Sequence, residues 1–470
     1  MSNTSNDADI SLQLDWSAYK DAGMGDAYAD IPKYGGNYAK AIAACINSRQ
    51  CEAEGKQLMC PSYRVSGDER LSTGGRVRLL KAALSTSQAE NPLLNPELAE
   101  AMELCVSCKG CKRECEANVD MPLIKAEYLA QKYQQQPRPL RSKLFAQWAD
   151  LLDQYRWLGG LIRLYNHTPL LKPLAARVLK LNPQANLPEP SFERLSQRQP
   201  DIKLLPGKRV ALFVDSFTRR FEPHIAEAAA ELLERAGYQV EWLQPANETS
   251  TAKPLCCGRT LLAQGMILEA KASAGRLVTS ICEYVERGYT IVGLEASCVL
   301  GLRDDAKALG LGDSVELAAQ HTLLLEEFLA RELKSGRLDL PFLETDQKTL
   351  VHGHCHQKAV GAMKSVRRIM KLLPKHDFEF IESSCCGMAG TFGLEAEHAD
   401  LSSQMANQSL LPAISQQPGC TVVANGFSCR QQIRQHSQAE PIHLAELLAR
   451  QLPPKVAVEA ESTQTNSVPA

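Results

Sequence analysis

The stretch Cys-Val-Ser-Cys-Lys-Gly-Cys-Lys-Arg-Glu-Cys, residues 105–115, decides how the first part of the chain is organised. Its cysteines have the spacing C-x2-C-x2-C-x3-C, with which bacterial ferredoxins hold a [4Fe–4S] cluster. These cysteines are Cys105, Cys108, Cys111 and Cys115. Residues three apart on a tight loop can turn their thiolates toward one small cube of iron and sulfide. The alternative is a set of four structural cysteines.

Other residues of the stretch fit a cluster-binding loop. Gly110 is expected to leave room for the backbone to wrap the cluster. Lys109, Lys112 and Arg113 are expected to offset part of the thiolate charge. In two-cluster ferredoxins the fourth cysteine of such a run binds the other cluster, so a partner run should lie elsewhere in the chain.

The partner run lies upstream and is incomplete. It consists of Cys45, Cys51 and Cys60, the last followed by Pro61, while Ser48 stands where a standard run has cysteine. Crossed ligation then predicts one full ligand set, made of Cys105, Cys108, Cys111 and Cys60. The other set would be Cys45, Cys51 and Cys115. Three thiolates suit a three-iron cluster, or a four-iron cluster whose fourth ligand is oxygen or missing. The alternative is a single cluster, with Cys45 and Cys51 as buried thiols.

Composition limits the function classes. The chain has 470 residues, 44% hydrophobic and 23% charged, which is typical of a soluble globular protein of several domains. A net charge of -2 gives no case for nucleic-acid binding. The polar N-terminus resembles no secretory signal, so the 16 cysteines are expected to face a reducing cytoplasm, where metal binding outranks disulfides. No apolar run is long enough to span a bilayer.

Helical patterns surround the cysteine runs and continue beyond them. We expect helices from about Tyr38, from Glu97 to Leu104 and from Met121 to Gln135, with Ser72 capping another. Between 137 and 190, basic residues alternate with Trp, Tyr and Leu at helical spacing. This pattern suits either an anionic membrane surface or an amphipathic connector packed on its own domain. Residues 182–206 contain five prolines and are expected to form a linker.

The second half contains an internal repeat. Strands are expected at 209–215, 238–243 and 289–294, and again near 350, at 377–382 and at 420–425, with helices between them. Strand–helix–strand order predicts parallel α/β units. Cysteines follow the strands, at the sheet edge where parallel sheets place their ligands. The second copy has Cys355, Cys385, Cys386 and Cys429, which suit a further iron–sulfur cluster or zinc. The first has Cys256, Cys257 and Cys298, with Ser216 near the fourth position.

Several of these stretches together resemble one family. They are Cys60-Pro-Ser-Tyr-Arg, the run 105–115, Glu-Ala-Ser-Cys298, His-Gly-His-Cys355-His-Gln-Lys, and Ser-Cys385-Cys386-Gly-Met-Ala-Gly-Thr-Phe-Gly. They resemble the iron–sulfur half of FAD-linked D-2-hydroxyacid dehydrogenases, which includes the glycolate oxidase iron–sulfur subunit, the anaerobic glycerol-3-phosphate dehydrogenase C subunit, and fused D-lactate and D-2-hydroxyglutarate dehydrogenases. The paired Cys-Cys-Gly units also resemble a heterodisulfide reductase subunit. Glu116, Ser48 and the missing leading cysteine of the first copy depart from the family pattern.

The resemblance implies electron transfer from a flavin to a quinone or another carrier. The chain has no Gly-rich flavin-binding stretch, so FAD is expected on a partner dehydrogenase subunit. The expected location is the cytoplasm, with peripheral contact at the inner face of the cell membrane as one option. One alternative is a heterodisulfide-reductase-like enzyme acting at the Cys-Cys-Gly site, and another is a zinc-stabilised scaffold. Metal analysis separates iron from zinc.

The predicted fold class is α/β, with a helical ferredoxin-like N-terminal domain followed by two tandem parallel α/β Cys-Cys-Gly domains. The predicted divisions are a flexible arm (1–37), the ferredoxin-like domain (38–136), a basic connector and linker (137–206), the first Cys-Cys-Gly domain (207–340), the second (341–453) and a disordered tail (454–470).

Overall fold

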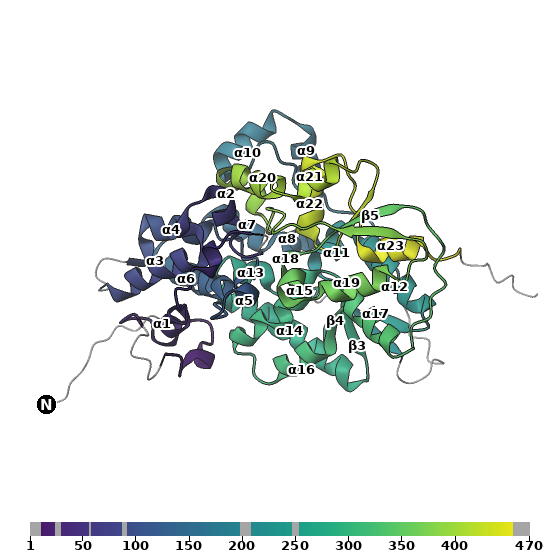
Figure 1. The fold of residues 1–470 in the computed structure, drawn as a ribbon, viewed down its shortest axis with the longest axis horizontal. Coiled ribbons are helices and arrows are strands. Elements are labelled where there is room, and N and C mark those ends of the chain that lie inside the picture. Colours follow the sequence, from purple (N-terminus) through teal and green to yellow (C-terminus); the bar gives the residue numbers. More distant parts are fainter. Residues whose placement is uncertain are drawn as a thin grey trace, which may run out of the picture.

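The computed structural model describes residues 11–23, 30–55, 58–86, 92–197, 208–246 and 253–454. The first part is helical and lies at one end of the molecule (Figure 1). Its helices are α1 (Gly36–Ala43), α2 (Pro61–Ser66), α3 (Thr73–Ser85), α4 (Pro96–Glu103), α5 (Cys111–Glu114) and α6 (Met121–Gln135). Local sequence explains these bounds. Ser72 accepts a hydrogen bond from the Gly75 amide and caps α3, as predicted, and Asn95 and Asp120 cap α4 and α6.

Part of the predicted flexible arm is packed against the helical region. The Glu127 carboxylate of α6 accepts hydrogen bonds from the Leu14 amide at 2.8 Å and from Trp16 Nε1 at 3.2 Å. The Asp15 amide donates to the Ala308 carbonyl at 2.8 Å. The expectation of a flexible arm is therefore wrong for residues 11–23, because Leu14 and Trp16 supply apolar surface that the core buries. Residues 1–10 and 24–29, and the predicted tail from 455 onward, lie outside the described residues.

Two separate parallel sheets form the second half. The first has the order β2-β1-β3-β4 and the second the order β6-β5-β7. The strands are β1 (Arg209–Phe213), β2 (Gln239–Trp242), β3 (Thr290–Gly293), β4 (Thr322–Leu324), β5 (Lys348–His352), β6 (Asp377–Phe380) and β7 (Thr421–Ala424). An isolated parallel bridge between Val423 of β7 and Ile442 extends the second sheet beside β7, at the place that β4 takes beside β3 in the first sheet. The α/β class is confirmed, and the two sheets share one strand order.

Helices connect the strands and cover the sheets. In the first unit they are α11 (Ser216–Phe221), α12 (Pro223–Arg235), α13 (Arg259–Ala263), α14 (Ile267–Glu286), α15 (Ala296–Arg303), α16 (Ser314–His321) and α17 (Leu325–Lys334). In the second they are α18 (Cys355–Val360), α19 (Met363–Met370), α20 (Ala399–Asn407), α21 (Leu410–Ser415), α22 (Phe427–His436) and α23 (Leu444–Arg450).

The two α/β units pack on each other through two pairs of helices. Helix α12 of the first unit packs against α23 of the second, and α17 packs against α19 (Figure 1). Apolar residues of all four helices belong to one buried cluster that also contains strand residues of both sheets. The second helix of each unit therefore meets the last helix of the other, which is an approximate two-fold arrangement.

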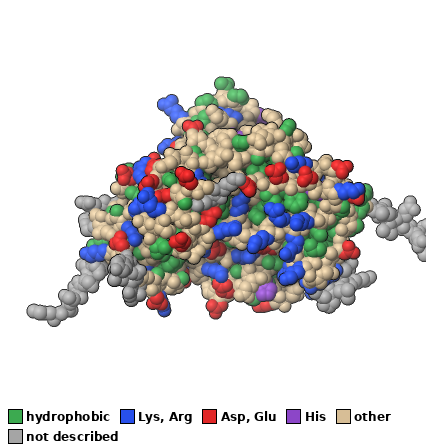
Figure 2. Space-filling model, viewed as in Figure 1, with side chains coloured by type: hydrophobic (Ala, Val, Ile, Leu, Met, Phe, Trp, Pro, Cys, Tyr) green, Lys and Arg blue, Asp and Glu red, His purple; other side chains and the backbone are tan. Residues whose placement is uncertain are grey.

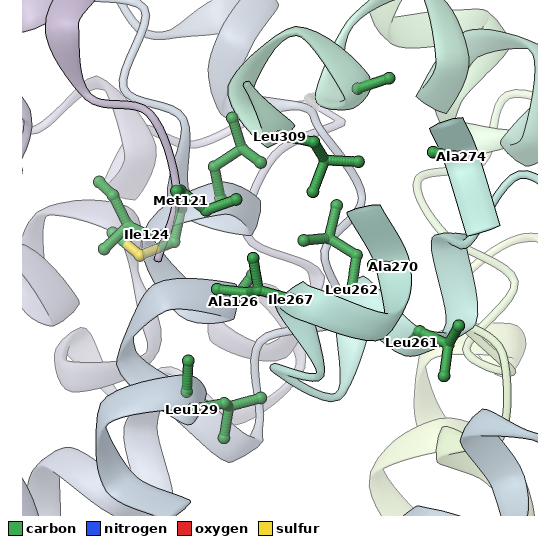
Figure 3. Packing of buried hydrophobic residues seen from close by; sticks show 14 of the residues in the cluster. Met121, Ile124, Ala126, Leu129, Leu261, Leu262, Ile267, Ala270, Ala274 and Leu309 are labelled. Atoms are coloured by element: carbon green, nitrogen blue, oxygen red, sulfur yellow. The ribbon is translucent and has the colours of Figure 1, made fainter. Parts of the chain in front are cut away.

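A second buried cluster joins the helical region to the first α/β unit. Met121, Ile124 and Leu129 of α6 pack against Leu262 of α13 and Ile267 of α14 (Figure 3). Gly265 lies at this contact with φ +68°, and a Cβ there would come within 2.7 Å of the Ala130 amide nitrogen. The predicted domain division stays a prediction, but the hydrophobic packing is continuous from the helical region into the first α/β unit.

The connector is helical and projects from the second α/β unit. It contains α7 (Leu140–Ala146), α8 (Trp148–Gln154), α9 (Leu158–His167) and α10 (Leu171–Leu179). Arg141 pairs with Glu395 at 3.1 Å, and Leu181 bridges to the same residue as an antiparallel β-bridge. Helices α9 and α10 form the top of the molecule in Figure 1. Among the described helices, none combines the length and the apolar character needed to cross a bilayer.

Candidate metal centres

Four cysteines from two loops meet at one buried cavity in the helical region. Cys105, Cys108 and Cys111 come from the loop that joins α4 to α5, and Cys60 comes from the residue before α2. Cys60, Cys108 and Cys111 are buried, and Cys105 is half-buried. These are the four residues that crossed ligation assigns to one set. Because both loops are needed, neither cysteine run alone could form this group.

The two loops approach each other backbone to backbone. A Cβ on Gly110 would lie 2.7 Å from both the amide nitrogen and Cα of Met59, so the role of this glycine is close contact between the loops. Glu114, which sequence reasoning missed, accepts hydrogen bonds from the Leu58 and Met59 amides at 2.9 Å. Cys60 and Lys109 have positive φ values of 55° and 64°, which non-glycine residues adopt rarely. Such strain often accompanies functional sites.

Arg76 is a buried positive group at this cavity. It is 2% exposed, lines the cavity, and donates from Nε to the Ala101 carbonyl at 2.6 Å and from Nη2 to Ser62 Oγ at 3.0 Å. Burial raises the pKa of Cys60 to about 11, and Arg76 opposes that rise. The Thr73 amide also donates to Cys60 Sγ at 3.0 Å. These contacts favour a thiolate where desolvation alone would disfavour it.

The lysines of the cysteine stretch do not balance thiolate charge as expected. Lys109 Nζ lies 3.1 Å from an Asp120 carboxylate oxygen and 2.8 Å from Asp304, and Lys112 pairs with the same two aspartates. Arg113 donates to the Lys358 carbonyl oxygen. The expectation was wrong because both lysines are paired with carboxylates, namely Asp120 at the start of α6 and Asp304 of the first α/β unit. These side chains instead connect the cysteine loop to both α/β units, by ion pairs to the first and a hydrogen bond to the second.

The other predicted set lies nearer the surface. Cys45 has Cys115 and Cys51 among the neighbours that raise its pKa, although burial is the larger cause. The Gly74 amide donates to Cys51 Sγ at 3.2 Å. Cys51 is buried, whereas Cys45 and Cys115 are half-buried and Ser48 is exposed. The three cysteines are thus neighbours, and Ser48 lies on an exposed part of their loop.

Four cysteines also meet in the second α/β unit. Cys355 begins α18 after β5, Cys385 and Cys386 follow β6, and Cys429 lies in α22 after β7. A hydrogen bond with Cys385 lowers the pKa of Cys355 well below its usual value despite burial, and His354 and His356 act in the same direction. Hydrogen bonds with Cys385 and Cys429 likewise lower the pKa of Cys386. These contacts make the four thiols one continuous group.

Histidines adjoin this group. His356 Nδ1 lies 3.5 Å from Cys355 Sγ, and its Nε2 lies 2.9 Å from Arg259 Nη2 of the first unit. One ring nitrogen of His352 and the thiols of Cys386 and Cys429 lie within 4.8 Å of one another. His354 accepts a hydrogen bond from the His356 amide and caps α18. His352 and His356 are therefore close enough to these thiols to act as ligands or proton carriers, whereas His354 is already used as a cap.

The first unit has a matching but shorter set. Cys256 and Cys257 follow β2, and Cys298 lies in α15 after β3. Hydrogen bonds link the Cys257 thiol to Cys256 and to Cys298. A hydrogen bond with Cys257 lowers the pKa of Cys298, but burial and the acids Asp215 and Glu295 raise it to about 12.

The two Cys-Cys-Gly groups face a single chamber. One cavity of about 230 Å³ is lined by cysteines of both groups and by Cys105 of the helical region. Phe145, Trp148 and Phe217 form an apolar part of its wall, and Arg259 lies between the two groups. Three cysteine groups that are far apart in the sequence thus converge on one cavity.

Comparison with known proteins agrees with this geometry. Residues 41–119 match the family described as a 4Fe-4S dicluster domain, and this segment contains all seven cysteines of the helical region. The chain is 23% identical to the glycolate oxidase iron-sulfur subunit of Escherichia coli over 423 residues, which covers 87% of this chain and 94% of the relative. It is 27% identical to the C subunit of the anaerobic glycerol-3-phosphate dehydrogenase of the same species, over 61% of this chain and 72% of the relative.

A longer relative shows the same similarity. The D-2-hydroxyglutarate dehydrogenase of Escherichia coli is 24% identical over 351 residues, which is 72% of this chain but only 33% of the relative. Residues 41–119 thus carry a 4Fe-4S domain, and the chain over most of its length is similar to these dehydrogenase and oxidase proteins. The similarity of this iron–sulfur protein to the larger relative therefore extends over about a third of that relative's length.

Some features of this iron–sulfur protein were visible in its sequence and others were not. The cysteines could be found by spacing and by the repeat. Glu114 and Arg259 carry no spacing signal, because each acts on a loop that is distant in the sequence. The Cys-Cys-Gly-Arg order at 256–259 was the one available hint for Arg259, since it puts a cation directly after the cysteine pair.

Proposed function

We propose that this chain is the iron–sulfur electron-transfer component of a flavin-dependent dehydrogenase that acts on a 2-hydroxyacid or on glycerol-3-phosphate. The observation that carries the proposal is the meeting of Cys60 with Cys105, Cys108 and Cys111 at one buried cavity. The similarity to named iron–sulfur subunits supports it. Those relatives are dehydrogenase and oxidase components, so we favour electron transfer over heterodisulfide reduction.

A [4Fe–4S] cluster bound by these four cysteines would supply one-electron chemistry. The chain's own residues prepare the site for it. Burial of Cys60, Cys108 and Cys111 keeps water away from the cavity. The Thr73 amide and Arg76 stabilise negative charge on Cys60, which favours the thiolate that iron requires. Cys45, Cys51 and Cys115 would hold a second cluster with three thiolates, and their more exposed loop suits exchange with a partner.

The Cys-Cys-Gly groups are proposed as further metal sites. Cys355, Cys385, Cys386 and Cys429 would hold a further cluster or zinc, since thiolates bind both. Cys256, Cys257 and Cys298 would hold a related centre. Each pair of adjacent cysteines is followed by a glycine whose amide donates toward the first thiol, at 3.5 Å for Gly258 and 3.4 Å for Gly387. Hydrogen bonds of this kind adjust the electronic properties of thiolate ligands.

The flavin is proposed to lie on a partner dehydrogenase subunit, and the acceptor to be a quinone or another carrier. Support comes from relatives that are named as subunits of larger enzymes. The apolar wall of the chamber, with Phe145, Trp148 and Phe217, suits a hydrophobic acceptor.

Peripheral contact with an anionic membrane is the second part of the partner proposal. Most of the large apolar side chains exposed on the connector lie on or beside α9 and α10, namely Tyr155, Trp157, Leu161, Leu164, Leu170, Leu174 and Val178. Residues 154–188 contain five Lys or Arg and no Asp or Glu. Hydrophobic and basic side chains are visible together at this end of the molecule (Figure 2). Such a surface suits the interface of an anionic bilayer, with the inner face of the cell membrane as the proposed location.

Metal analysis and one substitution test the central proposal. Protein purified without oxygen should contain about eight iron and eight sulfide per chain if the helical region holds two four-iron clusters, and more if the Cys-Cys-Gly groups hold clusters as well. Cys108→Ala should remove the low-temperature paramagnetic signal of one reduced cluster and most acceptor reduction, because Cys108 is a buried member of the four-cysteine group. Co-purification from the native host should recover a flavoprotein, whose identity would define the substrate class.

Cys420→Ala is the matched control. Cys420 is half-buried but belongs to none of the cysteine groups, so iron content and signal should stay as in the unaltered protein. A Cys108→Ala protein with unchanged iron and an unchanged signal would refute the assignment. Zinc without iron in the unaltered protein would refute the redox function itself.

A further inference from the structure

The first Cys-Cys-Gly group lacks a fourth cysteine, but the structure puts a serine in that position. β1 ends at Phe213 and β5 ends at His352, and each of these strands lies centrally in its sheet. Phe213 pairs with Gly293 of β3 just as His352 pairs with Ala424 of β7. Ser216 and Cys355 each come three residues after the strand end. By register, Ser216 is the counterpart of Cys355.

The same register aligns the remaining members of both groups. Cys298 comes five residues after Gly293, and Cys429 comes five after Ala424. Gly258 and Gly387 both have positive φ, and a Cβ on either would collide with the backbone of a helix, at Ala270 O and Ser402 O respectively. The two sites are therefore equivalent in backbone as well as in cysteines. They differ at one ligand position, where one has a hydroxyl and the other a thiol.

The Ser216 hydroxyl is in the state expected of a ligand. Ser216 is 4% exposed and lines the chamber, and among the described residues its Oγ has no nitrogen or oxygen atom as a hydrogen-bond partner, so that its polar neighbour is the Cys256 thiol. A buried hydroxyl without a partner is costly unless another group satisfies it. The hydroxyl therefore lies beside the thiol of Cys256, which is one of the three cysteines of the group.

Neighbouring oxygen groups are already committed to other partners. The Asp215 carboxylate accepts hydrogen bonds from the Phe217 amide at 2.9 Å and from Thr218 Oγ1 at 2.6 Å, and it caps α11. Ser297, the other serine of this group that lines the chamber, donates from Oγ to Glu295 at 2.8 Å. Among these three side chains, Ser216 alone offers an oxygen that is not bonded to another nitrogen or oxygen atom of the described residues.

We propose that Ser216 is the fourth ligand of a metal centre whose other ligands are Cys256, Cys257 and Cys298. This inference rests on the proposed function, which assigns a metal to that cysteine group. On binding, the Ser216 hydroxyl loses its proton to solvent and forms a metal–oxygen bond. An oxygen ligand is harder than a thiolate, so the centre has a spectrum and a reduction potential different from those of the all-cysteine group. The metal is iron in a cluster, or zinc.

Four variants, purified without oxygen, test the proposal by metal content and low-temperature spectroscopy. Ser216→Ala should lose the metal of one centre. Ser216→Cys should keep that metal and shift the spectrum of that centre alone, because a thiolate replaces the oxygen. If the metal is zinc, X-ray absorption at the zinc edge should show one oxygen neighbour replaced by sulfur. Ser297→Ala is the control, and it should match the unaltered protein in metal content and spectrum.

The fourth variant, Cys257→Ala, distinguishes two kinds of failure. If Cys257→Ala loses metal while the spectrum of Ser216→Cys equals that of the unaltered protein, the centre exists but Ser216 is not a ligand. If Cys257→Ala changes neither metal nor spectrum, the first Cys-Cys-Gly group holds no metal, and both assignments fail. Should Ser216→Ala not fold, the Ser216→Cys spectrum decides the question by itself.

Discussion

Gly258 and Gly387 each follow a pair of adjacent cysteines, and each allows a helix to pack directly against that pair. Gly387 has φ +92°, and a Cβ there would lie 2.2 Å from the Ser402 carbonyl oxygen in α20. The carbonyl belongs to a helix and cannot move without disturbing it. The glycine after the cysteine pair is therefore a packing requirement, in addition to its amide contact with the thiol.

Gly387→Ala should lower the free energy of unfolding by about 3 kcal/mol or more, because left-handed strain and overpacking add. Gly419→Ala is a matched control, since Gly419 has φ +84° and no atom within 4 Å of a built Cβ. It should cost about 1–2 kcal/mol, from the left-handed conformation alone. Urea unfolding of both variants measures the difference. Equal losses in the two variants would show that contact with α20 is unimportant.

At the scale of single residues, the sequence predicted the members of each cysteine group better than it predicted which side chains contact one another. Cysteine spacing identified the members of each group, because spacing is a local property. Lys109 was misjudged, since its partners Asp304 and Asp305 come from a region almost 200 residues away. Ser216 was noticed only as lying near a fourth position. Its equivalence to Cys355 depends on strand register, which the sequence does not provide.

At the scale of elements, a buried ion pair joins the two α/β units. Glu222, the residue before α12, accepts hydrogen bonds from Arg430 Nε at 3.1 Å and from Arg434 Nη1 at 2.8 Å, both in α22. Burial alone would raise the pKa of Glu222, but Arg430 and Arg434 lower it to about 2. Removing one partner of a buried pair leaves an uncompensated charge, which typically costs about 3–5 kcal/mol.

Glu222→Gln should therefore lower the free energy of unfolding by about 3 kcal/mol at pH 7. The folded-state pKa of about 2 lies below the ordinary value of 4.5, so the stabilisation is complete above pH 4.5 and is lost as pH falls toward 2. The difference between variant and unaltered protein should shrink by about 2 kcal/mol from pH 5 to pH 3. Urea unfolding across this range measures it.

The exposed pair between Lys375 and Glu344 provides the control for this prediction. Its atoms are 2.7 Å apart, and both side chains are more than 60% exposed. Glu344→Gln should change the free energy of unfolding by no more than about 0.5 kcal/mol. A pH-independent effect of Glu222→Gln would mean that the carboxylate charge is not what holds α12 to α22.

Elements with strong local signals were predicted well. Helix α6 runs from Met121 to Gln135, which are the predicted bounds, because Asp120 caps it and Pro122 lies in its first turn. Ser72 caps α3 for the same kind of reason. The strand β4 was missed because it contains only three residues, Thr322–Leu324, between two helices. So short a strand has no alternating pattern, and its formation depends on pairing with β3.

At the scale of the whole molecule, the sequence predicted the separate α/β units but not how they pack against each other. The α/β class and the repeat follow from the order of strands and helices. The shared chamber does not, because it depends on the packing of α12 against α23 and of α17 against α19. That packing places both Cys-Cys-Gly groups on one cavity. Hydrophobic periodicity indicates that a helix face is buried, but it does not say which other face covers it.

The apolar surface of α9 and α10 supports a last prediction, on membrane contact. Leu170 is 86% exposed and Val178 is 69% exposed, in a segment that carries basic but no acidic residues. The protein should bind phosphatidylglycerol vesicles more tightly than phosphatidylcholine vesicles. Leu170→Glu combined with Val178→Glu should weaken vesicle binding at least about tenfold in flotation assays, because two apolar side chains would no longer be buried in lipid. Leu268→Glu is the control, since Leu268 is 66% exposed on α14, outside this surface, and should leave binding unchanged. Equal losses in the double variant and the control, or no binding by the unaltered protein, would contradict a membrane role for these helices. Loss confined to the double variant would identify α9 and α10 as the membrane-facing end, on the same connector that supplies Phe145 and Trp148 to the chamber.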